Sequence, residues 1–167
     1  ITYKKKLEKI NLQIIFKEQF VSVLLNDFKE LLDIFSKIKI DIIHVNQISF
    51  FPDIDVVFDF IQKNKSAHTK IFMLMHDFSS VCSNNHLLKN DGSECGVICG
   101  RKHCECNSNA GENVKKWGDF FTNQADQIFC FSEHSRQILS QVYPTIFNKI
   151  NVTPHEVPFL RKVNVRK

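Results

Sequence analysis

The fold of this chain is decided by residues 71–82, which read IFMLMHDFSSVC. Five consecutive apolar residues end at Met75, and the polar pair His76-Asp77 follows immediately. A short apolar run bounded by polar residues is consistent with a strand inside a parallel sheet, and such a strand presents the residues at its carboxyl end to a ligand. We therefore expect a strand at residues 69–75, with His76 and Asp77 at a functional edge.

Apolar strands alternate with amphipathic helices along the chain. The expected strands lie at residues 40–45, 69–75, 127–131 and 149–152, and the expected helices at residues 18–38, after Asp53, around Trp117 and after Ser132. Residues 12–16 fit either a strand or the start of the first helix. This alternation predicts an α/β fold, a Rossmann-like parallel sheet with helices on both faces and a long cysteine-rich loop insertion.

The composition is that of a folded domain with modest charge. The 167 residues fit one domain, and with 43% hydrophobic and 24% charged residues the chain can bury a core. The net charge is +4, and the most basic segments are the two ends, which we interpret as solvated or as peripheral contacts to an anionic membrane. No basic helix with interleaved aromatic residues accompanies this charge, so a nucleic-acid partner is not expected.

The sequence also bears on the cellular compartment. No apolar run is long enough to span a membrane and no signal peptide is visible, so we expect a cytoplasmic, reducing environment. Disulfides are then an unfavoured use of the six cysteines. The first residue is Ile1, which predicts that the natural protein continues upstream.

Polar side chains gather where the expected strands end. They are His44 and Asn46, His76 and Asp77, Ser132, and His155 and Glu156. Because ligands of an open α/β sheet bind outside the carboxyl ends of its strands, we interpret these residues as the rim of a binding site. No glycine precedes Gly92, so no glycine-rich first turn within this chain can cradle nucleotide phosphates.

The loop behind His76-Asp77 holds five cysteines: Cys82, Cys95, Cys99, Cys104 and Cys106. A loop of this length has no core of its own, and a tetrahedral Zn²⁺ held by thiolates would fix it. We favour a structural zinc site at Cys82, Cys95, Cys104 and Cys106, and free thiols, disulfides and a redox thiol are the alternatives. Cys130 lies inside a strand and is expected to be a buried apolar residue.

The order of several motifs resembles a known enzyme family. DIIHVN at 41–46 and MHDF at 75–78 are followed by Cys82, Leu87-Leu88, Asp91-Gly92, Cys95, Trp117, Ala125-Asp126, Phe131-Ser132 and VTPHE at 152–156. This order resembles the N-terminal domain of bacterial group 1 glycosyltransferases, the retaining GT-B-fold enzymes of surface-polysaccharide biosynthesis. Their pattern reads HDY…CP…L…G…C…C…C…W. Ser83 stands here where that family has proline, and Phe78 where it has tyrosine.

The resemblance implies two Rossmann-like domains facing across a cleft, with residues 1–167 as the acceptor-side domain. The chain would lack the first strand and the C-terminal domain, which binds most of the nucleotide-sugar donor, so the chain alone is not expected to transfer sugar. His76 and Asp77 would be the catalytic pair, with Asp77 holding the His76 ring. The glycan or lipid-linked acceptor would be bound by Asn46, Ser132, His155 and Glu156.

A second hypothesis belongs to a different class. The chain would be a non-catalytic α/β module whose zinc-stabilised loop docks a partner protein. The downstream sequence separates the two hypotheses. A following domain with a glycine-rich turn, a basic residue and two glutamates favours the enzyme.

Overall fold

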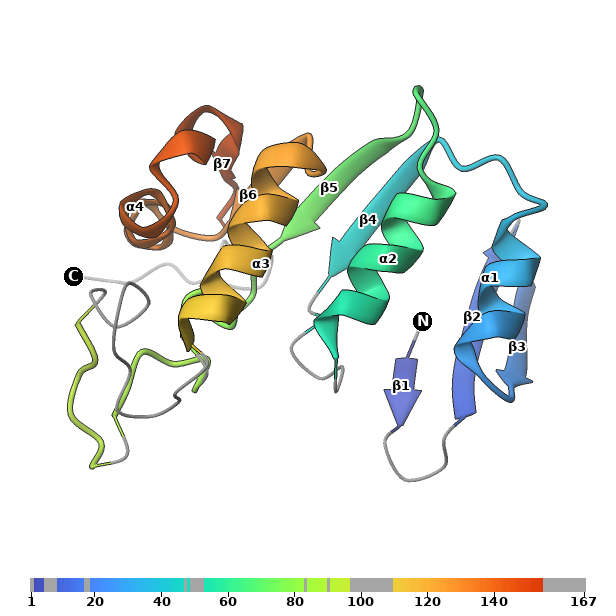
Figure 1. Cartoon of the computed structure of the whole chain (residues 1–167), viewed down its shortest axis with the longest axis horizontal. Coiled ribbons are helices and arrows are strands. Elements are labelled where there is room, and N and C mark those ends of the chain that lie inside the picture. Colours follow the sequence, from blue (N-terminus) through green and yellow to red (C-terminus); the bar gives the residue numbers. More distant parts are fainter. Residues whose placement is uncertain are drawn as a thin grey trace, which may run out of the picture. The chain divides into compact units, whose positions relative to one another are not determined.

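The computed structural model describes residues 2–4, 9–16, 19–46, 48, 53–82, 84–89, 91–96 and 110–154. The elements follow in the order β1-β2-β3-α1-β4-α2-β5-α3-β6-α4-η2-β7 (Figure 1). The chain divides into two compact units, Ile1–Phe72 and Met73–Lys167, and the division falls inside strand β5. Domain boundaries ordinarily fall in linkers, so this division does not decide the number of domains, and the single domain stays a prediction.

A four-stranded sheet carries the alternating part of the chain. It contains β4 (Ile42–Asn46), β5 (Lys70–Leu74), β6 (Gln127–Cys130) and β7 (Ile150–Val152), in that spatial order. β6 and β7 are parallel, with Ile128 opposite Ile150. The backbone N–H of Lys70 donates to the carbonyl of Asp41 at 2.8 Å, which places the starts of β4 and β5 together, as in a parallel pair. The predicted α/β class with a parallel sheet is confirmed.

A separate antiparallel sheet begins the chain, and the sequence pattern did not predict it. It contains β1 (Thr2–Lys4), β2 (Lys9–Phe16) and β3 (Gln19–Leu25), in the order β1-β2-β3. The expectation of a helix over residues 18–38 is therefore wrong in its first part. Phe20 and Leu24 are four positions apart, which fits a helix and an alternating strand equally, and the β-branched Val21 and Val23 between them favour the strand.

The helical part of this segment is α1 (Phe28–Phe35). Its N-cap is Asp27, whose carboxylate accepts a hydrogen bond from the backbone N–H of Glu30 at 2.9 Å. The Glu30 carboxylate accepts in return from the side-chain amide and the backbone N–H of Asn26, at 2.7 and 2.9 Å, and these bonds lower the pKa of Glu30. This reciprocal cap satisfies N–H groups that no helical carbonyl can reach, and so it fixes the helix start.

Strand β4 is covered on one face only. Val45 is buried, whereas Ile42 is 59% exposed and His44 and Asn46 on the same face are also exposed. The nearly continuous apolar run at residues 40–45 predicts a strand buried on both faces, and that expectation is wrong. β4 stands at the edge of its sheet, and its exposure alternates as in a strand that packs on one side.

Two of the remaining helices begin where the sequence predicts. α2 (Ile54–Asn64) follows the N-cap Asp53, and α4 (Glu133–Val142) follows the N-cap Ser132. α4 gives way at Tyr143 to the 3-10 helix η2 (Pro144–Lys149). α3 (Ala110–Asn123) buries the predicted Trp117, Phe120 and Phe121. The ring centroid of Phe121 lies 5.2 Å from Trp117 and 5.3 Å from Tyr143, so an aromatic cluster forms the core of the second unit.

Candidate functional site

The carboxyl ends of β5 and β6 lie side by side in the second unit. The backbone N–H of Met75 donates to the carbonyl of Phe129 at 2.8 Å, which joins the two ends. His76 and Asp77 continue from β5, and Phe131 and Ser132 continue from β6. The structure therefore brings together two of the predicted contributors to the rim, at the edge where parallel sheets bind ligands.

His76 is exposed at this edge. Its ring centroid lies 5.0 Å from that of Phe131, and the two ring planes are inclined by 48°. Phe131 is half-buried, so the imidazole rests on a partly fixed aromatic ring. His76 can therefore present a ring N–H or a ring nitrogen to a ligand from a restrained position.

Asp77 shapes the turn that follows. Its carboxylate accepts a hydrogen bond from the backbone N–H of Ser79 at 2.9 Å, and the carbonyl of Phe78 accepts from the N–H groups of Val81 and Cys82 at 2.8 and 2.7 Å. An aspartate that bonds the backbone two residues ahead makes an Asx turn. The role expected for Asp77 in holding the His76 ring stays a prediction.

Two long-range bonds anchor this turn to the rest of the unit. The Tyr143 hydroxyl donates to the carbonyl of Ser80, and the Asn113 side-chain amide donates to the carbonyl of Ser79 at 3.2 Å. Tyr143 is buried, and burial raises the pKa of its hydroxyl, which therefore stays protonated and able to donate. The Ser80 side chain is fully buried, and its hydroxyl has no hydrogen-bond partner among the described residues.

Ser132 lies next to the aromatic contact, at the first turn of α4. Its hydroxyl accepts from the backbone N–H of Ser135 at 3.1 Å and lies 3.0 Å from the Ser135 hydroxyl. Ser132 is exposed, so its hydroxyl can also meet a ligand at this edge. The predicted rim position of Ser132 thus coincides with a structural role as helix cap.

The other predicted rim residues lie in the first unit or outside the described residues. Asn46 ends β4 in the first unit and is exposed there, as is His44 two residues before it. His155 and Glu156 lie outside the described residues. Their part in the site stays a prediction.

The proposed zinc ligands are described only in part. Cys82 and Cys95 are buried free thiols, whereas Cys99, Cys104 and Cys106 lie outside the described residues. Where the structure describes the chain, no three His, Cys, Asp or Glu side chains gather as metal ligands would. Cys130 is buried as expected, and burial raises the pKa of its thiol, which argues against a nucleophilic role.

A pocket of about 390 Å³ opens between the loop after β5 and the exposed face of α4. The loop contributes Phe78, His86, Leu87, Leu88, Glu94, Cys95 and Gly96, and the helix contributes His134, Gln137, Ile138 and Gln141. None of these α4 residues was expected to have a functional role. Their spacing of three, four and seven positions places them on one helix face. This spacing can be read from the sequence, so it could have indicated that the four residues share a surface.

Comparison of the chain with protein-family models, with curated proteins and with solved structures finds no match. Of the helices in the described ranges, none has the length and apolar character that crossing a membrane requires. The proposed function therefore rests on the residues and geometry of the chain itself.

Proposed function

We propose that this chain is the acceptor-binding half of a glycosyltransferase, one that moves a hexosyl group from a nucleotide-sugar to a growing glycan or lipid-linked acceptor. The observation that carries the proposal is the meeting of His76 and Phe131 at the joined carboxyl ends of two neighbouring strands. An aromatic ring beside a polar ring is a surface on which a sugar can place an apolar face and a hydroxyl together.

The roles of the residues follow from this placement. His76 donates a hydrogen bond to a sugar hydroxyl near the reacting centre, and Asp77 keeps the turn that presents it. Ser132 bonds the acceptor from the neighbouring strand exit, with Asn46, His155 and Glu156 completing the rim. Charge that develops on the transferred sugar needs positioned donors in a site that excludes water, and a second, Rossmann-like domain that binds the nucleotide-sugar supplies the other half.

The proposal also includes the setting of the protein. A thiolate-bound zinc in the cysteine loop would be structural, because four thiolates leave no open coordination position for chemistry. The enzyme would act in the cytoplasm at the inner face of the membrane, where lipid-linked acceptors are presented. The basic termini would then favour contact with anionic lipid.

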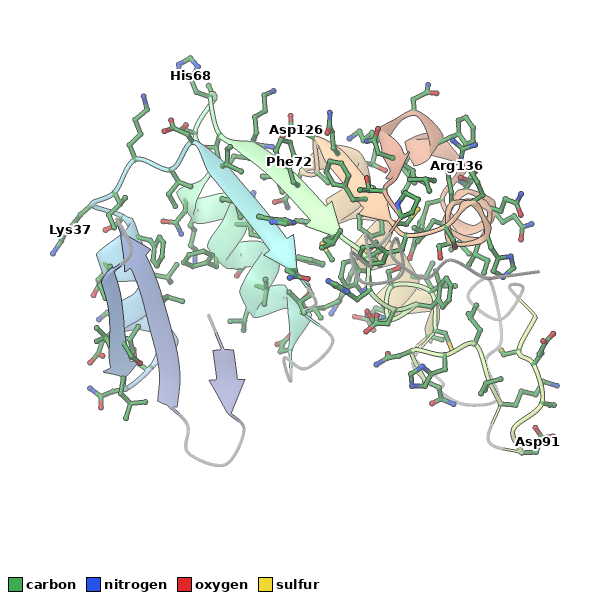
Figure 2. The ribbon with its side chains drawn as sticks, turned by 180° about the vertical axis from the view of Figure 1, so that it is seen from behind. Lys37, His68, Phe72, Asp91, Asp126 and Arg136 are labelled. Atoms are coloured by element: carbon green, nitrogen blue, oxygen red, sulfur yellow. The ribbon has the colours of Figure 1, made fainter. Side chains whose placement is uncertain are left out.

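The test is saccharide binding by two matched histidine variants. His68 precedes β5 (Figure 2). His76 follows β5, and both histidines are exposed. Calorimetric titration of the chain with neutral oligosaccharides is expected to show binding that His76→Ala weakens about tenfold or more, as loss of one good hydrogen bond predicts. His68→Ala is expected to bind as the unchanged chain does. Equal affinities for both variants would remove His76 from the site.

A further inference from the structure

The pocket lies between the loop after β5 and helix α4, and backbone hydrogen bonds hold its loop side in place. On the loop side the backbone N–H of Phe78 donates to the carbonyl of Asn85 at 3.0 Å, and that of Cys95 donates to the carbonyl of Leu87 at 2.6 Å. Leu87 has a positive φ of 59°, which an L-residue with a bulky side chain rarely adopts. The cross-loop bonds therefore hold the pocket wall in one conformation, at a cost in local strain.

The described lining combines apolar side chains and carboxamides with two imidazoles and one carboxylate. Phe78, Leu87 and the buried Ile138 supply apolar surface, while Gln137 and Gln141 present carboxamides from α4. A carboxamide offers a donor and an acceptor together, which matches neighbouring hydroxyl groups of a sugar. The volume of about 390 Å³ lies within the range of about 300–1,000 Å³ that is usual for small-molecule sites.

The charges of the side chains that line the pocket argue against an anionic ligand. Among the described residues that line the pocket, Glu94 is the one carboxylate and none is a lysine or an arginine, while His86 and His134 supply imidazoles. Phosphate and carboxylate ligands are normally held by such cations, or by several backbone N–H groups. Asp91 and Lys89 of the same loop carry opposite charges, which offset one another. An anionic ligand is therefore disfavoured.

We propose that this pocket holds one uncharged sugar residue of the acceptor, with Gln137 and Gln141 as specificity-determining residues. This inference rests on the proposed function. The pocket lies between the segment that leaves β5 and the helix that follows β6, so it adjoins the edge where His76 and Ser132 lie. It would select glycans whose residue at this position carries neither a carboxylate nor a phosphate.

The experiment compares trisaccharides of equal length and different charge on the full chain. Trimers of glucose, galactose and mannose are the neutral probes, with trimers of galacturonic acid and of glucosamine as the anionic and cationic ones. We expect the best neutral trimer to bind at least about tenfold more tightly than the galacturonic acid trimer, and Gln137→Ala to weaken it about tenfold. Gln62→Ala, the same change on an exposed position of α2, is the matched control and is expected to have no effect.

Three other outcomes would overturn the inference. A fourth would count against both the inference and the proposed function. A glucosamine trimer that binds most tightly, and loses its affinity in Glu94→Gln, would favour a cationic ligand. A galacturonic acid trimer that binds most tightly would favour an anionic one. A neutral trimer weakened by His76→Ala but not by Gln137→Ala would refute the pocket and leave the proposed function standing. Failure of the unchanged chain to bind any trimer would count against both.

Discussion

Tyr143 shows how a single residue positions the candidate site. Its hydroxyl donates to the carbonyl of Ser80, 63 residues earlier in the sequence, and its ring packs 5.3 Å from that of Phe121. The bond ties the turn after His76 to the rest of the unit, as does the bond from the Asn113 side chain to the carbonyl of Ser79. The residue therefore links the core of the second unit to its functional edge.

Replacing Tyr143 by Phe is expected to lower the free energy of unfolding by about 1–3 kcal/mol, because a buried carbonyl loses its donor. The effect should depend on pH. The folded pKa of Tyr143 is raised by burial, so the contribution is complete below the unfolded pKa of about 10 and falls as pH rises above it. Denaturant unfolding of both proteins at pH 7, 9, 10 and 11 measures this. A difference between the two proteins that stays constant up to pH 11 would contradict it.

Some residues of the site could be predicted from the sequence and others could not. His76, Asp77 and Ser132 were found because apolar runs end at them, and the ends of parallel strands meet at one edge. The pairing of Tyr143 with Ser80 and the meeting of the loop with Gln137 depend on how distant segments pack. No periodicity in one sequence carries that information.

Among the elements, α1 shows most clearly what local sequence decides. The segment before it fits a strand or a helix by hydrophobic spacing alone, and the cap at Asp27 places the helix start. By contrast, β6, α4 and β7 were predicted to within two residues at their ends, because polar caps and Pro144 bound them. The ends of an element could be predicted where a capping residue or proline marks them. They could not be predicted where the apolar spacing fits a helix and a strand equally.

Replacing Asp27 by Ala is expected to destabilise the chain by about 1 kcal/mol, which is typical for loss of an N-cap. Asp33→Ala removes the same charge from an exposed position of α1 that caps nothing, and it is the control. Thermal or urea unfolding followed by circular dichroism provides the measurement. Equal stabilities of the two variants would show that the cap does not fix the helix.

At the scale of the whole molecule, a parallel sheet supplies the candidate edge, and the loop after β5 lies beside it. The loop is held by backbone bonds among residues 78–95 and by the contacts of Ser79 and Ser80. A zinc ion at Cys82, Cys95, Cys104 and Cys106 would add a cross-link to the same loop.

Elemental analysis tests the metal hypothesis. Protein purified under reducing conditions without added metal is expected to contain about one equivalent of zinc, and Cys95→Ser to contain far less. Cys130→Ala changes a buried thiol outside the loop and is expected to keep the metal. Folded, reduced protein with less than about a tenth of an equivalent would contradict a zinc site.

The central claim is that sugars bind at the carboxyl ends of β5 and β6. Backbone amide chemical shifts of isotope-labelled protein, followed during titration with the neutral trisaccharides, test it most directly. We predict shifts concentrated at residues 76–80 and 131–137, with little change at Lys70 and Gln127 where the same strands begin. Shifts confined to those strand starts, or no shifts at any saccharide concentration, would contradict it.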